Sequence, residues 1–381
     1  MKKAFYAGLA GLALFEVARV WFIMPLPGSQ RIESLDLAYF LHTHRWFFRI
    51  SSLLLIASGS RVAFQSARKR LPVAASLAAL LLVWLFNFEM TAESMFQQPR
   101  SLAFLPKGES KVGEESVAIA VESGGEYKAY PIRFLVYHHQ VQDTIGGKPI
   151  LVTYCSVCRT GRVFQPVVRG QQEKFRLVGM DHFNAMFEDA TTGSWWRQST
   201  GKAVAGPLKG ESLPEMDCSQ MTLRKWFELH PGALVMQPDE AAKGGYDKEG
   251  KFERGESKGK LTRTDRASWG EKSWVVGIEI GSVSKAYDWN RLNEQRIIND
   301  RIGETPVVLA LAADQRSFAA FERPVDAGDF SIRDDILLAN EKSYNLSGRN
   351  LAEPTRQLRR VAAWQEFWHS WRTFHPGTLR D

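Results

Sequence analysis

The fold of this chain is organised around one stretch, Pro149-Ile-Leu-Val-Thr-Tyr-Cys155-Ser-Val-Cys158-Arg-Thr-Gly161-Arg-Val-Phe164. The β-branched and apolar residues from Ile150 to Tyr154 are typical of a strand, and a second such run starts at Arg162. The two cysteines lie at the turn between the runs. A Cys-x-x-Cys turn can present both sulfur atoms on one side of a tight corner.

This spacing has two common chemical uses, a redox dithiol and half of a metal site. A thiolate is the reactive form, and the adjacent cation of Arg159 favours it. Thr160-Gly161 turns the chain into another strand, so the corner differs from a thioredoxin turn, in which a helix follows the cysteines. A closed zinc site needs four ligands, and the sequence contains no second Cys-x-x-Cys.

Other residues can complete either kind of site. The candidates are His138, His139, Asp181, His182 and Cys218. Two thiolates with one or two histidines suit copper or zinc. The predicted redox residues are Cys155, Cys158, Arg159 and His138, and the predicted metal ligands are Cys155, Cys158, His138 and His182. Solvent should reach the sulfur atoms through an opening that Trp196 helps to line, because a thiol buried in apolar surroundings is inert.

Each polar candidate also has a structural interpretation. His138 and His139 fit a helix face with one packed ring and one solvated ring. Asp181-His182 fits a hydrogen-bonded pair in a loop. Trp195-Trp196 is more typical of a core or a cleft wall than of a stacking platform.

Composition excludes some functions. The chain has 381 residues and a formal net charge of +7, but its basic residues are scattered among acids, so we expect no nucleic-acid partner. Its 3 cysteines are too few for a disulfide-stapled scaffold. The first hundred residues instead contain apolar runs that approach the length of a membrane span. These runs are Ala4 to about Pro25, Phe47–Phe64 and Leu71–Phe88.

The first run carries Glu16 and Arg19, which can neutralise each other on one helix face. Lys2-Lys3 precede this run. Arg61 lies near the end of the second run, and Arg68, Lys69 and Arg70 lie between the second and third runs. The positive-inside rule places both basic clusters in the cytoplasm. We therefore predict a membrane protein whose C-terminal region is extracytoplasmic; in a bacterium this means the inner membrane, with the C-terminal region facing the periplasm or the outside. Its partners would be the lipid bilayer and an unidentified membrane or periplasmic protein.

The remainder of the chain is rich in predicted strands. Ser123-Gly-Gly125 joins two short runs in a hairpin pattern, and Leu223–His230 reads as a helix that ends at Pro231-Gly232. Residues 239–272 are rich in Gly, Lys, Glu and Asp, which predicts an exposed linker.

After that linker the pattern recurs. Lys128-Ala-Tyr130 reappears as Lys285-Ala-Tyr287, 157 positions later (287 − 130). Asp143, Gly146, Pro149 and Phe164 have counterparts at the same offset. Trp226-Phe-Glu-Leu-His230-Pro-Gly likewise resembles Trp371-Arg-Thr-Phe-His375-Pro-Gly.

These observations predict an N-terminal α-helical membrane bundle of three spans over residues 1–92. A β-rich α+β extracytoplasmic region of two tandem repeats follows, with the repeats at 101–238 and 273–381. At the same offset, Cys155 falls on Ala312, Cys158 on Gln315 and His138 on Gln295. Positions kept in both copies serve the shared fold, and the residues that differ point to chemistry in the first copy alone.

An ordered set of motifs resembles the bacterial family catalogued as domain of unknown function 3179. The set comprises Tyr130-Pro131, His138, Asp143, Gly147, Pro149, Thr153-Tyr-Cys155-x-x-Cys158-x-Thr, Thr192-Gly-Ser-x-Trp196, Gln198, Gly201 and Ala205-Gly-Pro-x-x-Gly210. Some relatives carry selenocysteine in the Cys-x-x-Cys region, and the resemblance therefore implies redox chemistry more than structural zinc. The chain departs from the family pattern at Arg159, where Gly is usual, at His139, and at His182-Phe183-Asn184.

Three hypotheses follow. The first is a membrane-anchored extracytoplasmic protein with a redox-active dithiol, a thiol/disulfide or related oxidoreductase. The second is a copper- or zinc-binding module that uses the same cysteines with histidines. The third is a non-enzymatic scaffold in which the cysteines are vestigial.

Overall fold

The computed structural model of the chain describes residues 2–65 and 70–381. These residues form two compact units. Unit 1 comprises Met1–Gln97, Lys174–Arg197 and Lys202–Glu211, and unit 2 comprises Gln98–Glu173, Gln198–Gly201 and Ser212–Asp381. The division differs from the predicted boundaries, because most of residues 174–211 associate with the N-terminal helices.

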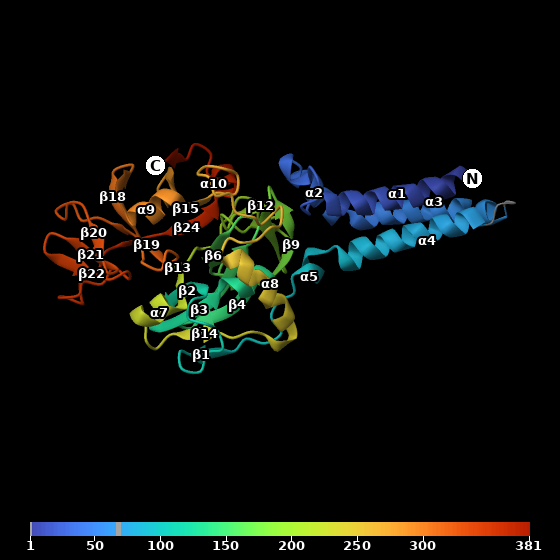
Figure 1. Cartoon of the computed structure of the whole chain (residues 1–381). Helices are drawn as coiled ribbons and strands as arrows, with labels where there is room; N and C mark the ends of the chain where they lie inside the picture. Colours follow the sequence, from blue (N-terminus) through green and yellow to red (C-terminus); the bar gives the residue numbers. More distant parts are fainter. Residues whose placement is uncertain (1, 66–69) are drawn as a thin grey trace. The chain divides into compact units, whose positions relative to one another are not determined.

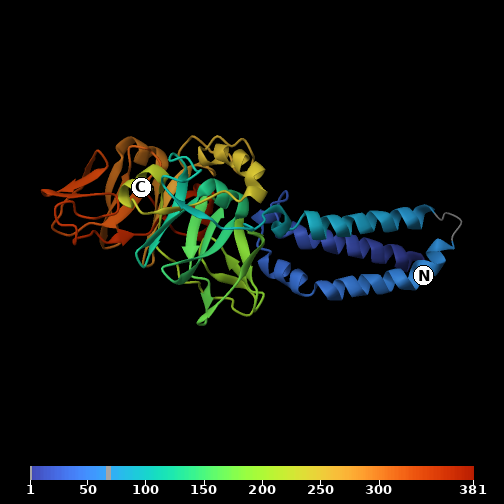
Figure 2. The ribbon, with the colours of Figure 1, turned by 90° about the horizontal axis from the view of Figure 1, so that it is seen from below.

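Three helices in the described part of the chain are long and apolar enough to cross a membrane: Lys2–Trp21, Arg45–Phe64 and Arg70–Glu89. The first two are α1 and α3. The third consists of α4 (Arg70–Trp84) and the π-helical turn η2 (Leu85–Glu89). Figures 1 and 2 show α1, α3 and α4 side by side in one bundle. The prediction of three potential spans is confirmed, although Arg68 and Lys69, used to predict orientation, lie outside the described residues.

A buried polar network ties these helices together. Glu16 is wholly buried, and its carboxylate accepts hydrogen bonds from Arg19 at 3.2 Å, Arg49 at 2.7 Å and Asn87 at 3.0 Å. The predicted pairing of Glu16 with Arg19 is therefore confirmed. Charges within an apolar bundle are tolerated when they neutralise one another, and this carboxylate is shared by residues of α1, α3 and η2.

Unit 1 also contains a sheet with strand order β12-β11-β10-β9. Its strands are β9 (Phe175–Asp181), β10 (Asn184–Asp189), β11 (Trp195–Arg197) and β12 (Ala203–Ala205). His182 and Phe183 both have positive φ angles, which form the tight turn between β9 and β10. The shorter helices of unit 1 are η1 (Ser29–Arg31), α2 (Leu35–Thr43) and α5 (Ala92–Met95).

The first half of unit 2 has two main sheets, with strand orders β1-β14-β3-β2-β13 and β4-β5-β6. Gly124 and Gly125, with positive φ angles, form the predicted hairpin turn between β2 and β3. The elements are β1 (Phe104–Pro106), β2 (Val117–Ser123), β3 (Glu126–Pro131), α6 (Ile132–His138), β4 (Gln140–Ile145), β5 (Lys148–Cys155), β6 (Thr160–Phe164), β7 (Val167–Val168), β8 (Gln171–Gln172), β13 (Cys218–Thr222), α7 (Leu223–Leu229) and β14 (Leu234–Met236).

The second half of unit 2 has sheets of order β24-β15-β16-β25, β17-β18-β19-β23 and β20-β21-β22. Its elements are β15 (Trp274–Ile280), β16 (Val283–Asp288), α9 (Trp289–Gln295), β17 (Ile297–Ile302), β18 (Thr305–Leu311), β19 (Phe318–Glu322), β20 (Ser331–Arg333), β21 (Ile336–Ala339), β22 (Lys342–Tyr344), β23 (Arg360–Val361), β24 (Ala363–Phe367), α10 (Trp368–Phe374) and β25 (Leu379–Arg380).

Several strand pairings in the two halves share one register. Tyr130 pairs with Ile119 between β3 and β2, and Tyr287 pairs with Val276 between β16 and β15. In each half a parallel strand adds to this hairpin, with Leu234 beside Lys128 and Leu379 beside Lys285. The Tyr130 hydroxyl donates to Asp143 at 2.7 Å, and the Tyr287 hydroxyl donates to Asp300 at 3.0 Å.

Residues 239–272 are not the exposed linker that their composition predicts. They contain η3 (Glu240–Ala242) and α8 (Lys243–Glu253). Tyr246 and Phe252 of α8 are buried in the hydrophobic core that also contains Val117, Tyr154 and Phe367. Two large aromatic side chains therefore hold an otherwise polar segment against unit 2.

Candidate functional site

The Cys-x-x-Cys corner joins two central strands of unit 2. Cys155 is the last residue of β5 and pairs with Thr160, the first residue of β6. Arg159, between them, has a φ angle of 56°. A glycine adopts this left-handed conformation readily, whereas an arginine needs support from its surroundings.

The support for Arg159 comes from its side chain. The guanidinium donates to Gln365 Oε1 at 2.9 Å and to the carbonyl oxygens of Phe252 at 3.0 Å and Glu253 at 2.9 Å. It also stacks on the Trp274 ring, 3.5 Å from the ring centroid. Burial lowers the pKa of Arg159, and the charges of Tyr154 and Glu253 oppose that effect. Arg159 therefore connects the corner to α8 and β24, which is a positioning role.

Both cysteines of the corner are wholly buried, each with 0% of its surface exposed. The backbone N–H of Phe367, at the end of β24, donates to the Cys158 carbonyl at 2.8 Å. This arrangement differs from the expectation that solvent reaches the sulfur atoms, because β24 and the start of α10 pack on the corner.

Two titratable side chains meet the carbonyl group between the cysteines. Lys272 Nζ donates to the Val157 oxygen at 2.7 Å, and His369 Nε2 lies 3.0 Å from the same oxygen. Lys272 Nζ and His369 Nε2 are themselves 3.0 Å apart. The three groups form a compact hydrogen-bonded cluster at the centre of the Cys-x-x-Cys sequence, which we call the Lys272 cluster.

The electrostatics of this cluster are unusual for a core. Burial lowers the pKa of Lys272 to about 8, while negative charge on Cys158 and Cys155 would raise it. Burial, followed by the positive charge of Lys272, lowers the pKa of His369 to about 3. His369 is therefore neutral at neutral pH, and Lys272 can carry its positive charge beside the two thiols.

A second polar network supports the strands on either side of the corner. Glu366 is wholly buried and accepts from the Thr160 hydroxyl at 2.9 Å and from Arg162 at 3.0 Å. Gln198 donates to the Thr153 hydroxyl at 3.0 Å and to the Thr160 carbonyl at 3.1 Å. These hydrogen bonds fix the geometry of the corner, although Glu366 Oε2 and Arg162 Nε are buried without a hydrogen-bond partner among the described residues.

His138 and His139 both lie near the end of α6. His138 Nε2 is 2.6 Å from the Tyr246 hydroxyl, so this histidine links α6 to α8. His139 is buried, and burial lowers its pKa to about 4. Its carbonyl accepts from the backbone N–H of Tyr154 at 2.9 Å, directly before Cys155. Among residues 2–65 and 70–381, no group of three or more His, Cys, Asp or Glu side chains is arranged to hold a metal ion.

His182 belongs to unit 1, whereas the cysteine corner belongs to unit 2. Its Nδ1 is 2.6 Å from Asp181, and its Nε2 is 3.2 Å from Glu33. The hydrogen bond with Asp181 raises the pKa of His182. Trp196 is also in unit 1, where its indole N–H donates to Asp189 at 2.9 Å and its ring is buried.

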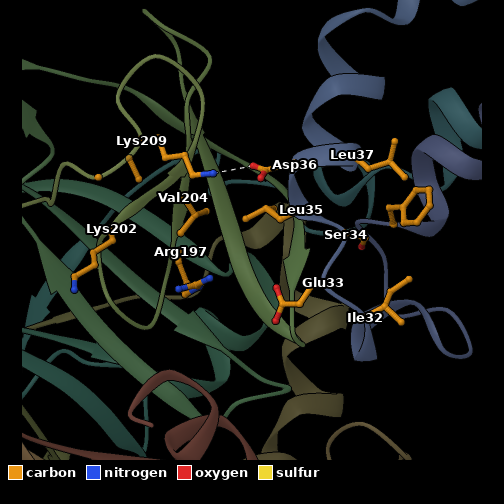
Figure 3. A pocket seen from close by; sticks show the side chains of 13 residues that line it. Ile32, Glu33, Ser34, Leu35, Asp36, Leu37, Arg197, Lys202, Val204 and Lys209 are labelled. Atoms are coloured by element: carbon orange, nitrogen blue, oxygen red, sulfur yellow. Dashed lines mark hydrogen bonds and ion pairs between the residues drawn. The ribbon is translucent and has the colours of Figure 1, made fainter.

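A cavity of about 770 Å³ lies beside these residues in unit 1. Figure 3 shows Arg197 of β11, with Lys202 and Lys209 from the loops on either side of β12, facing the residues that lead into and begin α2. Lys209 and Asp36 form an ion pair of 2.8 Å across it, and Glu33 and Arg197 also line it. Glu33 pairs with His182, and Arg197 donates to Asp181 at 2.9 Å. Described ion pairs thus engage much of the charge around this cavity.

Sequence reasoning missed Lys272 and His369. Lys272 stands at the end of the polar segment interpreted as a linker, and His369 follows two tryptophans near the C-terminus. The only sequence signal for Lys272 is its comparison with the first half, where the residue 157 positions earlier is the acidic Glu115. That signal becomes meaningful only once the partner strand of the corner is known.

Comparison with known proteins identifies the family. The family model described as Protein of unknown function (DUF3179) matches residues 102–378, which is most of the chain. The chain belongs to this family, as the ordered motifs predict. No curated protein and no solved structure matches the chain.

Proposed function

We propose that this member of the DUF3179 family is a membrane-anchored thiol/disulfide oxidoreductase whose redox couple is Cys155 and Cys158. The observation that supports this function best is the Lys272 cluster. Lys272 and His369 come from distant parts of the sequence and meet the carbonyl oxygen of Val157, the residue between Ser156 and Cys158. A corner that serves packing alone has no need of an ammonium group at this position.

The cost of burying Lys272 supports a chemical role. A buried ammonium group is expensive unless it is paired and hydrogen-bonded. Lys272 is 9% exposed, and the contacts described above are with a carbonyl oxygen and an imidazole. An anion at the corner offsets this cost, and a thiolate of Cys155 or Cys158 supplies one. The cluster therefore favours the thiolate, which is the nucleophilic form of cysteine.

The proposed reaction is thiol–disulfide exchange with a partner disulfide, R–S–S–R. The thiolate of one cysteine attacks a sulfur atom of the partner, and one R–S⁻ leaves. The second cysteine then displaces the other R–S⁻, which forms the Cys155–Cys158 disulfide. Two electrons pass to the partner, and two protons convert the leaving groups to R–SH. Lys272 and His369 stand where a proton can be taken up or released.

The burial of both sulfur atoms sets a condition on this reaction. A partner disulfide must reach the corner, which β24 and the start of α10 cover. The backbone hydrogen bond from Phe367 to Cys158 is one contact that has to open. The proposal therefore includes local displacement of the Phe367–His369 segment during exchange, and this requirement restricts access to partners that can promote the opening.

We further propose that the two halves of unit 2 are tandem repeats and that the reactive cysteines belong to the first. The shared strand registers support the repeat. The second half has Ala312 and Gln315 in place of the cysteines. Lys272 corresponds to Glu115 of the first half at the offset of 157, and His369 corresponds to Arg224 at the offset of Trp226 and Trp371 (371 − 226 = 145). Glu115 and Arg224 form an ion pair with a 3.0 Å hydrogen bond. The cysteines and the Lys272 cluster are thus replaced together, as expected of groups that act together.

The proposed location is the bacterial inner membrane, with unit 2 on the periplasmic or outer side. The three potential spans and the basic residues before the first span support this orientation. The partner would be a membrane or periplasmic protein that carries a disulfide or a dithiol. The lipid bilayer would hold the chain near that partner.

Reaction with oxidised glutathione tests the proposed function. The full-length chain in detergent is reduced, freed of reductant and mixed with this small disulfide, and its cysteines are then mapped by mass spectrometry after alkylation. We expect a Cys155–Cys158 disulfide and the release of two molecules of reduced glutathione per chain. Cys218→Ser is the matched control and should react like the wild type, whereas Cys155→Ser should not form the disulfide. Unchanged thiols at both positions in the folded wild type would contradict the proposal.

The copper- or zinc-binding hypothesis uses the same cysteines, with His138 and His182 as the other proposed ligands. Elemental analysis of protein purified without a histidine tag distinguishes this hypothesis from the redox hypothesis. A stoichiometric metal that is lost in Cys155→Ser would favour the metal module. Fitness unchanged in a Cys155→Ala/Cys158→Ala double variant would instead favour the scaffold reading.

A further inference from the structure

A second cavity, of about 420 Å³, lies in unit 2. Residues of β2, β13, α7 and the chain before and within β23 line it. The polar side chains in this lining include Glu122, Asp217, Ser219, His230, Gln357 and Arg360. The lining is rich in charged and hydroxyl groups, which is unusual for a packing defect. Packing defects in protein cores are lined by apolar side chains.

Arg360 is the cation in this lining. Arg360 is half-buried, and its guanidinium makes no hydrogen bond, and no ion pair within 4.0 Å, with any residue that the structure describes. Asp217 and Glu122 are the acids whose charges act on it. A guanidinium group has five N–H donors in a planar fork, which suits a carboxylate. Arg360 thus presents unused donors to a polar cavity.

Trp226 adds an unused donor. Its side chain is 2% exposed, and its indole N–H has no hydrogen-bond partner among the described residues. In the second half of unit 2 the corresponding Trp371 donates to the Thr378 hydroxyl at 2.8 Å. A buried N–H without a partner costs free energy, and a ligand oxygen can remove that cost.

His230 differs from its counterpart in the same way. In the second half His375 Nε2 pairs with Glu279 at 3.2 Å. His230 stacks on Tyr127 and Trp226 instead, with ring centroids 4.3 and 4.1 Å away, and it forms no such pair with Glu122 within the described chain. Glu122 and His230 both line the cavity. Glu122 hydrogen-bonds the Tyr127 side chain instead of the histidine, and its carboxylate keeps acceptor capacity for a ligand.

We propose that this cavity binds a small zwitterion, such as a free amino acid or a short peptide, independently of the cysteine corner. The carboxylate would bind Arg360, and the ammonium group would lie between the carboxylates of Glu122 and Asp217. Ser219 and Gln357 are placed to hydrogen-bond either end. A purely anionic ligand fits less well, because two acids line the same space. The volume is at the small end of the range of ligand pockets, which suits a molecule of this size.

Calorimetric titration of the full-length chain in detergent tests this proposal. The probes are the free amino acids and alanyl-alanine, together with acetyl-alanyl-alanine and alanyl-alaninamide, which each lack one charge. We expect saturable binding of a zwitterionic probe, and at least tenfold weaker binding of the two singly charged peptides. Arg360→Met and Glu122→Gln should each weaken binding at least tenfold. Glu279→Gln, in the second half, is the matched control and should leave binding unchanged.

Three results would overturn the proposal. The first is the absence of saturable binding of every zwitterionic probe. The second is equal binding of acetyl-alanyl-alanine, which would identify an anion site. The third is wild-type affinity in Glu122→Gln. Glu122 is exposed, so this substitution leaves the core intact. The Glu122→Gln result therefore tests the proposal even if Arg360→Met does not fold.

Discussion

Replacement of Lys272 by methionine tests whether this side chain carries a buried charge beside the cysteines. The folded protein lowers the pKa of Lys272 from 10.5 to about 8. Below pH 8 the amine is charged in both folded and unfolded chains, so the cost of burying the charge is fully present. Between pH 8 and pH 10.5 the unfolded chain holds a proton that the folded chain has released. The free energy of unfolding of the wild type should therefore rise with pH in this interval.

The magnitude follows from the same two values. Each pKa unit is worth about 1.4 kcal/mol, so the full effect is about 3 kcal/mol, and about 2 kcal/mol of it falls between pH 7 and pH 9.5. Methionine has no proton to exchange, so Lys272→Met should lack this part of the pH dependence. At pH 7 the variant gains by avoiding the charge burial but loses a charged hydrogen bond to the Val157 oxygen, worth about 1.5–3 kcal/mol.

The assay is reversible denaturation of the full-length chain in detergent at a series of pH values from 7 to 9.5. The difference in unfolding free energy between Lys272→Met and the wild type should decrease by about 2 kcal/mol across the series. Lys128→Met is the matched control, because Lys128 pairs with Asp143 at 2.9 Å in the first half. A constant difference between Lys272→Met and the wild type would refute the assignment of a buried, titrating ammonium group.

Three further substitutions test other parts of the structure. Glu366→Gln should lower the free energy of unfolding by about 3 kcal/mol because it leaves Arg162 buried with one acid fewer, and chemical denaturation checks this. Glu16→Leu removes the carboxylate at the centre of the helix bundle, and we expect thermal aggregation in detergent at a temperature several degrees lower. His182→Asn removes a group whose pKa Asp181 raises, so the wild type should lose up to about 1 kcal/mol relative to this variant as the pH rises from 6 to 8. Equal thermal stability profiles of this variant and the wild type would contradict that last expectation.

Local pattern was sufficient to predict several elements of the fold. The apolar composition of Leu71–Phe88 specifies a potential span because length and hydropathy are properties of one segment. The run from Ile150 to Tyr154 likewise forms β5, since its β-branched and aromatic residues suit a buried strand. The pairing of Glu16 with Arg19 follows from helical spacing alone.

The polar segment before β15 shows where this reasoning fails. Few of its residues are apolar, and its average composition therefore indicates exposure. Two side chains, Tyr246 and Phe252, are nevertheless enough to bury one face of α8. Composition averaged over a segment does not reveal such isolated anchors.

The candidate site could be predicted only in part. The cysteines are adjacent in sequence, so their spacing revealed the corner. Lys272 and His369 reach it only because β24 packs against β6 and pairs with β15. Lys272 precedes β15 and His369 follows β24, a long-range arrangement that no local pattern encodes. The burial of the sulfur atoms has the same cause. His182 shows the opposite failure. Its residue type made it a candidate metal ligand, but in the structure it forms its ion pairs within unit 1.

Redox titration of Cys155 and Cys158 in the full-length protein is the most direct test of the proposed function. The protein is equilibrated in buffers of defined ratios of oxidised to reduced dithiothreitol or glutathione. The thiols are then trapped by alkylation, and the masses of the cysteine-containing peptides are measured by mass spectrometry. We predict that these two cysteines interconvert as a two-electron couple with a midpoint between about −270 and −120 mV, the range of known catalytic dithiols. Cysteines that stay reduced at every potential while the protein remains folded would contradict the account.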